Sequence, residues 1–436
     1  MKVIIYFLCS SIVWCYGTSF FYFSNFYNIT TSLKNKNYKY KDYDIYSSLD
    51  LESLFHLSPG LDVGVISFDY RNKSKFLDFS IMPIIVNKEI NQIAFGSSYS
   101  RLGLYGRIEK SFLKAYFGNN SIKIGRGNHK NKLYPHSSIL DSGFYPSKDE
   151  ILFKTKKKNY SFEFSFGQLS NEKDSDNKLI KRNFGKHSLT LLNNKSTSIE
   201  FGEMIIYTGI NRNLELVYMN PFLPYFLNGL EIERKDQIND NDNSMLYLII
   251  NSTYKDINYY SEVIIDDFQI DDTGSEHAIG FKLGLNHIKP IGLSWIFEYV
   301  NINKCVYLHH GNFTSWQSNG KPIGYFHGPD SKSIRFQGSY NWNDYTVYFG
   351  LQTLVKGLNN INTDWDNIVE SGYIAKYDSH LYNCLSVVKK TKHFHYELGW
   401  NNQPIENEIN GSVNLLNRND QYFLKLILKN NILFQH

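Results

Sequence analysis

Residues 160–167 read YSFEFSFG and alternate strictly between large aromatic side chains and small or charged ones. On an extended chain, successive side chains point to opposite faces, so one face carries Tyr160, Phe162, Phe164 and Phe166. A period of two residues is typical of a β-strand whose faces meet different surroundings. In a transmembrane barrel, the aromatic face would meet lipid and the polar face the lumen.

The same alternation recurs at 291–299, 345–352 and 393–400, where one face is apolar and the other is rich in Gly, Ser, His and Glu. Several of these runs reach about ten residues, the length of a tilted membrane strand. A soluble β-sandwich also alternates but places turns roughly every 8–12 residues. A propeller would repeat about every 40–50 residues, and no such repeat is found. The pattern therefore favours an all-β, antiparallel transmembrane β-barrel over these soluble alternatives.

The composition agrees with strands at a membrane and gives no sign of a nucleic-acid partner. The 436 residues include 33 Tyr and 31 Phe but only 10 Pro, and aromatic residues suit both strands and membrane interfaces. Lys plus Arg is 46 and Asp plus Glu is 42, which leaves a net charge of +4. So small an excess of positive charge in a chain of this size gives no indication that the protein binds nucleic acid.

The first seventeen residues have the layout of a secretory signal. Lys2 precedes an apolar run over 3–16 and a small residue, Gly17. That run is shorter than the roughly 20 residues that a membrane-spanning helix needs. We therefore expect a signal peptide over 1–17 and a single barrel domain over 18–436 in the outer membrane. Cys305 and Cys384 lie beyond the signal, and we expect them to be isolated apolar residues rather than partners in a disulfide.

The sequence contains no motif of a common enzyme or metal site. A phosphate-binding glycine loop, a paired-cysteine metal motif and a nucleophile elbow are all absent. His309 and His310 would point to opposite faces of a strand. The acidic pairs at 266–267 and 271–272 could bind calcium, although a solvated strand end is the favoured interpretation. We expect no catalysis, no metal and no cofactor.

Two loop segments combine aromatic rings with amide or charged groups, as sugar binding requires. They are residues 312–317, NFTSWQ, and residues 324–330, GYFHGPD. Each is as readily an ordinary loop or part of an interfacial aromatic girdle.

Several short patterns follow one another in the order found in a known family. They are IKIGR at 122–126, SIL at 138–140, Pro146, HSL at 187–189, IEFGEMIIY at 199–207, YMNPF at 218–222, NSML at 243–246, EVIIDDFQ at 262–269, GKPIG at 320–324 and HGPDS at 327–331. This succession resembles the Wzi-type capsule assembly proteins over roughly residues 100–335.

The resemblance implies a barrel of about eighteen strands that binds exported capsular or exopolysaccharide and helps to assemble or retain it at the cell surface. The candidate polysaccharide-binding residues lie on the shared patterns or in the aromatic loops: Arg126, Glu203, Asp266, Asp267, Trp316, Tyr325 and Asp330. The patterns leave open whether these residues touch sugar or shape the barrel.

The sequence also leaves a second function open. A porin or sugar-uptake channel would have the same strands but an open lumen, and a barrel enzyme is a more distant third possibility. The partners we expect are polysaccharide and outer-membrane lipid, with the protein acting as a monomer.

Overall fold

The computed structural model describes most of the chain from residue 46 onward. The described residues are 46–58, 61–86, 99–101, 104–127, 138–143, 145, 147–193, 196–225, 242–267, 277–289, 291–309, 312–368, 378–391, 394–401, 408–409, 412–413 and 421–435. The predicted signal peptide, 1–17, lies outside them. Within these residues, no helix has the length and hydropathy needed to cross a membrane.

Eighteen of the described strands pair with both neighbours in a continuous antiparallel ring. They are β1 (Tyr46–Ser58), β2 (Leu61–Lys73), β3 (Leu77–Val86), β5 (Leu104–Phe117), β6 (Asn120–Arg126), β7 (Asp149–Lys156), β8 (Tyr160–Gln168), β10 (Leu179–Asn193), β11 (Thr197–Ile210), β12 (Asn243–Tyr254), β13 (Ile257–Asp267), β14 (Ala278–His287), β15 (Gly292–Ile302), β18 (Ser331–Trp342), β19 (Tyr345–Lys356), β20 (Asp378–Lys390), β21 (Phe394–Asn401) and β24 (Gln421–Gln435).

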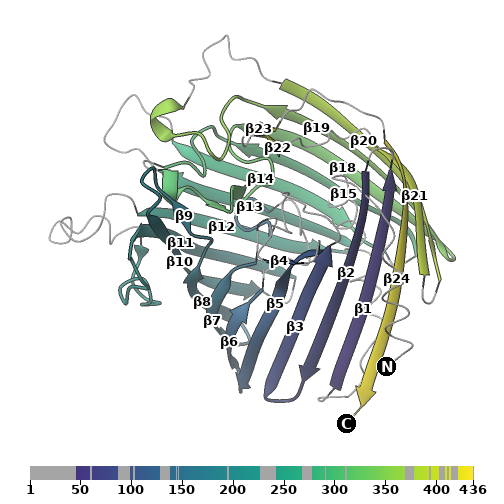
Figure 1. The fold of residues 1–436 in the computed structure, drawn as a ribbon, viewed down its shortest axis with the longest axis horizontal. Coiled ribbons are helices and arrows are strands. Elements are labelled where there is room, and N and C mark those ends of the chain that lie inside the picture. The colour runs from purple at the N-terminus through teal and green to yellow at the C-terminus, as the bar shows by residue number, and fades with distance from the viewer. Residues whose placement is uncertain are drawn as a thin grey trace.

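The ring closes between the first and last strands, where Tyr46 pairs with Gln435 and Leu57 with Leu424. Figure 1 shows β24 beside β1 at this closure. The remaining elements are short: β4 (Tyr99–Arg101), β9 (Glu172–Lys173), β16 (Gln317–Ser318), β17 (Lys321–Pro322), β22 (Glu408–Ile409), β23 (Ser412–Val413) and the 3₁₀ turns η2 (Asn312–Thr314) and η3 (Trp365–Asn367). The predicted all-β barrel of about eighteen strands is confirmed.

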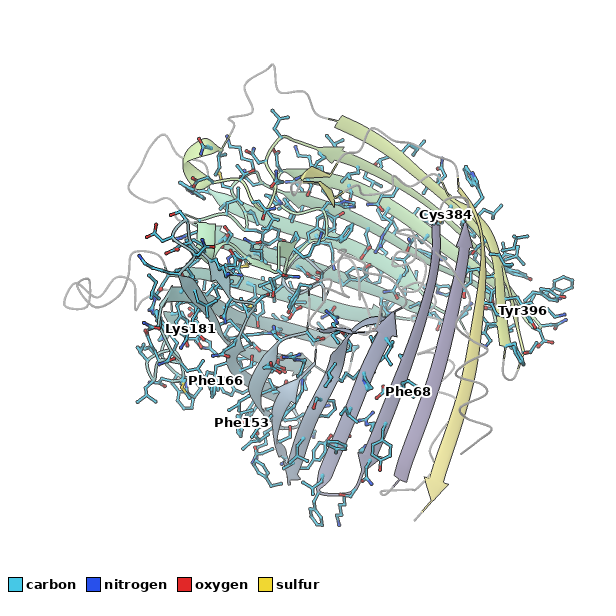
Figure 2. The ribbon with its side chains drawn as sticks, in the orientation of Figure 1. Phe68, Phe153, Phe166, Lys181, Cys384 and Tyr396 are labelled. Atoms are coloured by element: carbon cyan, nitrogen blue, oxygen red, sulfur yellow. The ribbon has the colours of Figure 1, made fainter. Side chains whose placement is uncertain are left out.

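The wall has its apolar side chains outside and its polar side chains inside, as the alternation predicted. In β15, Leu293 and Phe297 are 47% and 39% exposed, whereas Ser294 and Glu298 are buried. Tyr396 of β21 projects away from the wall in Figure 2. This arrangement is the inverse of that in a water-soluble protein, and it suits a wall with hydrocarbon outside and polar groups inside.

The connections differ in length at the two ends of the ring. One end has tight turns, such as 118–119, 157–159, 255–256 and 343–344, and the other has long segments, such as 127–148, 211–242, 303–330 and 357–377. In outer-membrane barrels, the short turns face the periplasm and the long loops face the outside. Cys305 and Cys384 are not joined by a disulfide.

The arrangement of the wall predicts that a charge is more costly on the outer face than on the lumen face. Replacing Leu283, which is 53% exposed halfway along β14, with Arg puts a charge among lipid chains and should destabilise the barrel by about 2–4 kcal/mol. Urea titration of folding into liposomes measures this change. The matched control is Gln337→Arg, at a lumen-side position of β18, which should cost much less. Equal losses in the two variants would contradict the assignment of the faces.

Candidate functional site

The lumen side of the wall carries charged residues that are paired with one another. The Lys282 ammonium lies 2.5 Å from the Glu262 carboxylate, and both side chains are almost fully buried. Arg335 pairs with Glu298, which also accepts a hydrogen bond from Tyr260. Breaking such a pair leaves an uncompensated buried charge, so each partner holds the other in place.

The 303–330 connection between β15 and β18 folds into the lumen instead of extending away from the barrel. Its Trp316 is 1% exposed and its Tyr307 is fully buried. The Tyr307 backbone N–H and the Trp316 indole N–H both donate to the Asp266 carboxylate at 2.5 Å. On the other side, Arg182 of β10 donates to the carbonyls of Phe313 and Ser315 at 2.7 and 2.8 Å. The connection is therefore fixed to the wall at two separate strands.

Asp266 shares the inward parity of Glu262 and Ile264 and lies at an irregularity in β13. The pairing with β14 skips this residue, because Ile265 pairs with Ile279 and Asp267 with Ala278. A β-bulge of this kind re-aims a side chain and frees it from the regular ladder. The Asp266 carboxylate meets the connection from the lumen face of the strand.

The end of the 127–148 connection packs beside the same segment. The Ile139 N–H and the Ser138 hydroxyl donate to Glu262 at 2.8 and 3.0 Å. In return, the Tyr307 hydroxyl donates to the Ile139 carbonyl at 2.5 Å. A Cβ atom at Gly324 would lie 2.5 Å from both that carbonyl and the Tyr307 hydroxyl oxygen, so only glycine fits there.

A third connection, 357–377, contributes through its described part, residues 357–368. The Asn359 amide donates to the Asp330 carboxylate at 2.9 Å. Asp330 itself has a φ of 53°, a conformation that Asp adopts more readily than most residues. Lys356 then bridges the two connections, because its ammonium donates to the carbonyls of Pro329 and Asn359.

Apolar side chains from the wall and from these connections form one buried cluster inside the ring, which we call the lumen core. Burying each large side chain contributes about 1.5–3 kcal/mol, more than a typical hydrogen bond at about 1 kcal/mol. Burial therefore holds the connections inside, and the hydrogen bonds set their position. The lumen core consists of Ile139, Leu140, Tyr145, Leu169, Phe184, Met204, Ile206, Met245, Tyr247, Ile264, Ala278, Val300, Ile302, Cys305, Val306, Tyr307, Trp316, Ile323, Tyr325 and Ile361.

Three of the seven candidate sugar-binding residues meet in this network. Asp266 and Trp316 are hydrogen-bonded to each other, and the buried Tyr325 donates its backbone N–H to Tyr307 at 3.0 Å. Asp330 lies nearby at the junction with residues 357–359. The contacts give these residues a supporting role in the packing, and direct contact with sugar stays a prediction.

The other three candidates lie elsewhere. Arg126 pairs with Asp149 at 2.5 Å on the outer face of the wall. Glu203 also lies on the outer face, where its carboxylate accepts a hydrogen bond from the Tyr225 backbone N–H. The side chain of Asp267 is outside the described part of the chain.

The sequence analysis did not single out Arg182, Glu262 or Tyr307 as site residues, although they anchor the connections. Arg182 and Glu262 occupy inward positions of otherwise regular strands, and a charge at such a position was the available signal. Among the described residues, no group of three or more His, Cys, Asp or Glu is placed to hold a metal ion.

No family model matches the chain, and no curated protein matches it in sequence. Solved structures do match. Wzi of Escherichia coli, described as an outer-membrane, carbohydrate-binding β-barrel involved in group 1 capsule assembly, has a TM-score of 0.60 and 12% identity, covering 94% of this chain and 88% of its own. The opdK protein and OprD of Pseudomonas aeruginosa have TM-scores of 0.52 and 0.51 at 10% identity. Both cover 90% of this chain, and 99% and 96% of their own chains. At these identities the likeness shows the fold alone, that of an outer-membrane β-barrel.

Removing the shared acceptor tests whether Asp266 holds the connection in place. Asp266→Ala leaves the Tyr307 N–H and the Trp316 indole N–H without their acceptor, at a cost of about 1–3 kcal/mol for each buried group. We expect faster hydrogen exchange over 303–309 and 312–330, measured by mass spectrometry on protein in bilayers.

The control is Asp176→Ala, which removes an exposed partner of Lys178 and should leave exchange unchanged, because exposed pairs contribute little. Unaltered exchange in the Asp266 variant would refute the anchoring role.

Proposed function

We propose that this protein is an outer-membrane lectin-like barrel that binds exported capsular or exopolysaccharide and helps to assemble or retain it at the cell surface. The observation that carries the proposal is the lumen core, in which inward-folded connections are fixed to the wall by buried hydrogen bonds. A solute channel needs an open path through the lumen. A polysaccharide-binding surface instead needs a rigid platform at the external end, because ordering loops and side chains on binding costs free energy that a preorganised site avoids.

The chemistry of the connections supports sugar recognition. Phe326 and His327 are half-buried with ring centroids 5.1 Å apart, and Gln352 lies 3.2 Å from the His327 ring nitrogen. Trp365 packs against the lumen core and remains partly exposed. Aromatic faces next to amide groups offer stacking and hydrogen bonds to a sugar ring.

Within this proposal, the candidate residues take different parts. Asp266, Trp316 and Tyr325 hold the platform in shape, and the half-buried Asp330 is positioned to meet ligand at its edge. Roles for Arg126, Glu203 and Asp267 in sugar binding stay predictions. The proposal includes export by a signal peptide over 1–17, a monomeric barrel, and no catalysis.

The runner-up function is a porin or sugar-uptake channel. Its support is the ring of charged residues on the lumen wall, such as Glu298 and Arg335, because charged lumen residues tune the selectivity of barrels that conduct. The likeness to opdK and OprD shows a shared fold and does not decide between the two functions.

Binding and conductance measured on the same purified protein separate the two functions. We expect the wild-type protein to bind the immobilised surface polysaccharide of its own strain and to give no large, steady single-channel current in planar bilayers. Asp266→Ala should weaken binding and increase conductance, because it loosens the platform while the strand pairing of the wall is kept.

The matched control is again Asp176→Ala, which should resemble the wild type in both assays. Steady wild-type currents without polysaccharide binding would overturn the lectin proposal in favour of the channel.

A further inference from the structure

Part of the wall's outer face is covered by the chain itself. Ile205 and Tyr207 of β11 are 3% and 0% exposed. They share the outward parity of Ile199 and Phe201 of the same strand, which are 38% and 46% exposed. The cover is the first part of the β11–β12 connection, residues 211–225, which we call the strap.

Packing contacts fix the strap to the wall. The Tyr218 ring packs at a tilt against Tyr207 with centroids 4.5 Å apart, and the Tyr225 ring lies 4.5 Å from the His187 ring of β10. A Cβ atom at Gly185 would lie 2.8 Å from the Tyr225 hydroxyl, so the glycine makes room for the tyrosine. In Figure 2, Lys181 of β10 and Phe166 of β8 mark the side of the barrel on which the strap lies.

The strap reaches far down the wall. Its Phe222 stacks on Phe162 with centroids 6.0 Å apart and an interplanar angle of 11°. Phe162 is the third residue of β8, next to the tight turn at 157–159. Since the lipid-facing band of such barrels is about 25 Å tall, this contact places the tip of the strap at the level of the hydrocarbon.

Hydrocarbon requires that the polar groups of an irregular segment find partners within the protein, and several backbone groups of the strap do so. Inside the strap, the N–H groups of 218, 219, 220 and 223 donate to the carbonyls of 215, 216, 217 and 220, and the N–H of 219 is shared between 215 and 216. The Phe222 N–H donates to the Asn220 side chain, and the Tyr225 N–H donates to Glu203. Pro221 and Pro224 have no N–H to satisfy.

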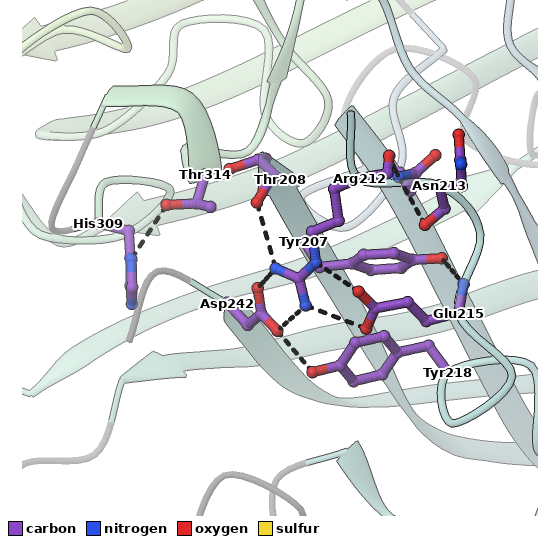
Figure 3. A network of polar contacts seen from close by, with 10 residues as sticks. Tyr207, Thr208, Arg212, Asn213, Glu215, Tyr218, Asp242, His309 and Thr314 are labelled. Atoms are coloured by element: carbon purple, nitrogen blue, oxygen red, sulfur yellow. Dashed lines mark hydrogen bonds and ion pairs between the residues drawn. The ribbon is translucent and has the colours of Figure 1, made fainter. Parts of the chain in front are cut away.

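The charged groups of the strap are paired as well. The Arg212 guanidinium donates to Glu215 at 2.7 Å and is held by Asp242, with the Tyr207 ring 5.1 Å from its centre. Asp242 also accepts a hydrogen bond from the Tyr218 hydroxyl at 2.5 Å. Figure 3 shows Arg212 enclosed between the two carboxylates. Charges satisfied in this way can lie at the edge of a bilayer.

Three of the exposed side chains of the strap are large and apolar, and the other three, Asn211, Asn213 and Asn220, are amides. Leu216 is 82% exposed and Phe222 is 83% exposed, and Leu214 is 38% exposed. This surface continues the apolar outer face of the neighbouring strands, where Phe201 and Leu191 are each 46% exposed.

We propose that the strap is a lipid-contacting element that inserts Leu216 and Phe222 among the acyl chains of the outer membrane and thickens the barrel wall on the side of β8, β10 and β11. Continuity with the lipid-facing wall identifies lipid as the occupant. A protein partner fits less well, because a fully buried aromatic side chain supplies about 150–250 Å² and a stable protein interface buries about 1,200 Å² or more.

Site-directed labelling tests the proposal in the full chain with its native cysteines replaced by alanine. Phe222→Cys and, separately, Leu216→Cys are labelled with an environment-sensitive fluorophore, and the protein is folded into bilayers. One reference is Leu283→Cys on the exposed outer wall, and the other is Asp176→Cys, whose native side chain is 65% exposed in the β8–β10 connection.

We expect phospholipids brominated in their acyl chains to quench the labels at 222 and 216 as strongly as the label at 283, with little quenching by aqueous iodide. Strong iodide quenching, as at 176, would place the strap in water and overturn the proposal. Protection from both quenchers together with a dimeric mass would assign the surface to a second copy of this chain and would likewise overturn it. Two separate label positions keep the test decisive if one substitution disturbs folding.

Discussion

The rest of this structure depends on the need to pair every backbone polar group within the protein where water is absent. The ring leaves no strand edge unpaired, because β1 pairs with β24 along twelve positions, from Tyr46 with Gln435 to Leu57 with Leu424. Because side chains alternate along a strand, closure places apolar residues such as Leu283 outside and ions such as Lys282 inside. The inside then holds charges, which must pair or meet water.

The inward-folded connections and the strap follow from the same constraint. Inside, Glu262 and Asp266 accept hydrogen bonds from connection backbone and side chains, so wall carboxylates and connection N–H groups satisfy one another. Outside, Glu203 does the same for Tyr225. In both places a wall carboxylate positions a connection, and apolar burial supplies most of the stabilisation.

Local alternation was enough to predict the strands and the face on which each side chain lies, because that face depends only on the residue's position in the strand. The candidate site was harder to read. Asp266 and Trp316 were chosen separately, but their contact joins residues fifty positions apart, and no local pattern indicates such a contact. Trp316 was chosen from a loop segment and is buried, and Glu203 was chosen from the shared patterns and faces outward. Long connections that fold back onto a wall leave no periodic pattern.

We propose that the 303–330 connection rests inside the ring as a fixed platform for polysaccharide. The Ser170 and Ser318 hydroxyls lie 2.6 Å apart, one after β8 and the other in the connection. The most direct measurement is therefore disulfide formation in a Ser170→Cys, Ser318→Cys double variant in intact cells. The account predicts rapid, near-complete cross-linking with undiminished retention of cell-bound polysaccharide. Absence of the cross-link, or loss of polysaccharide retention once it forms, would contradict it.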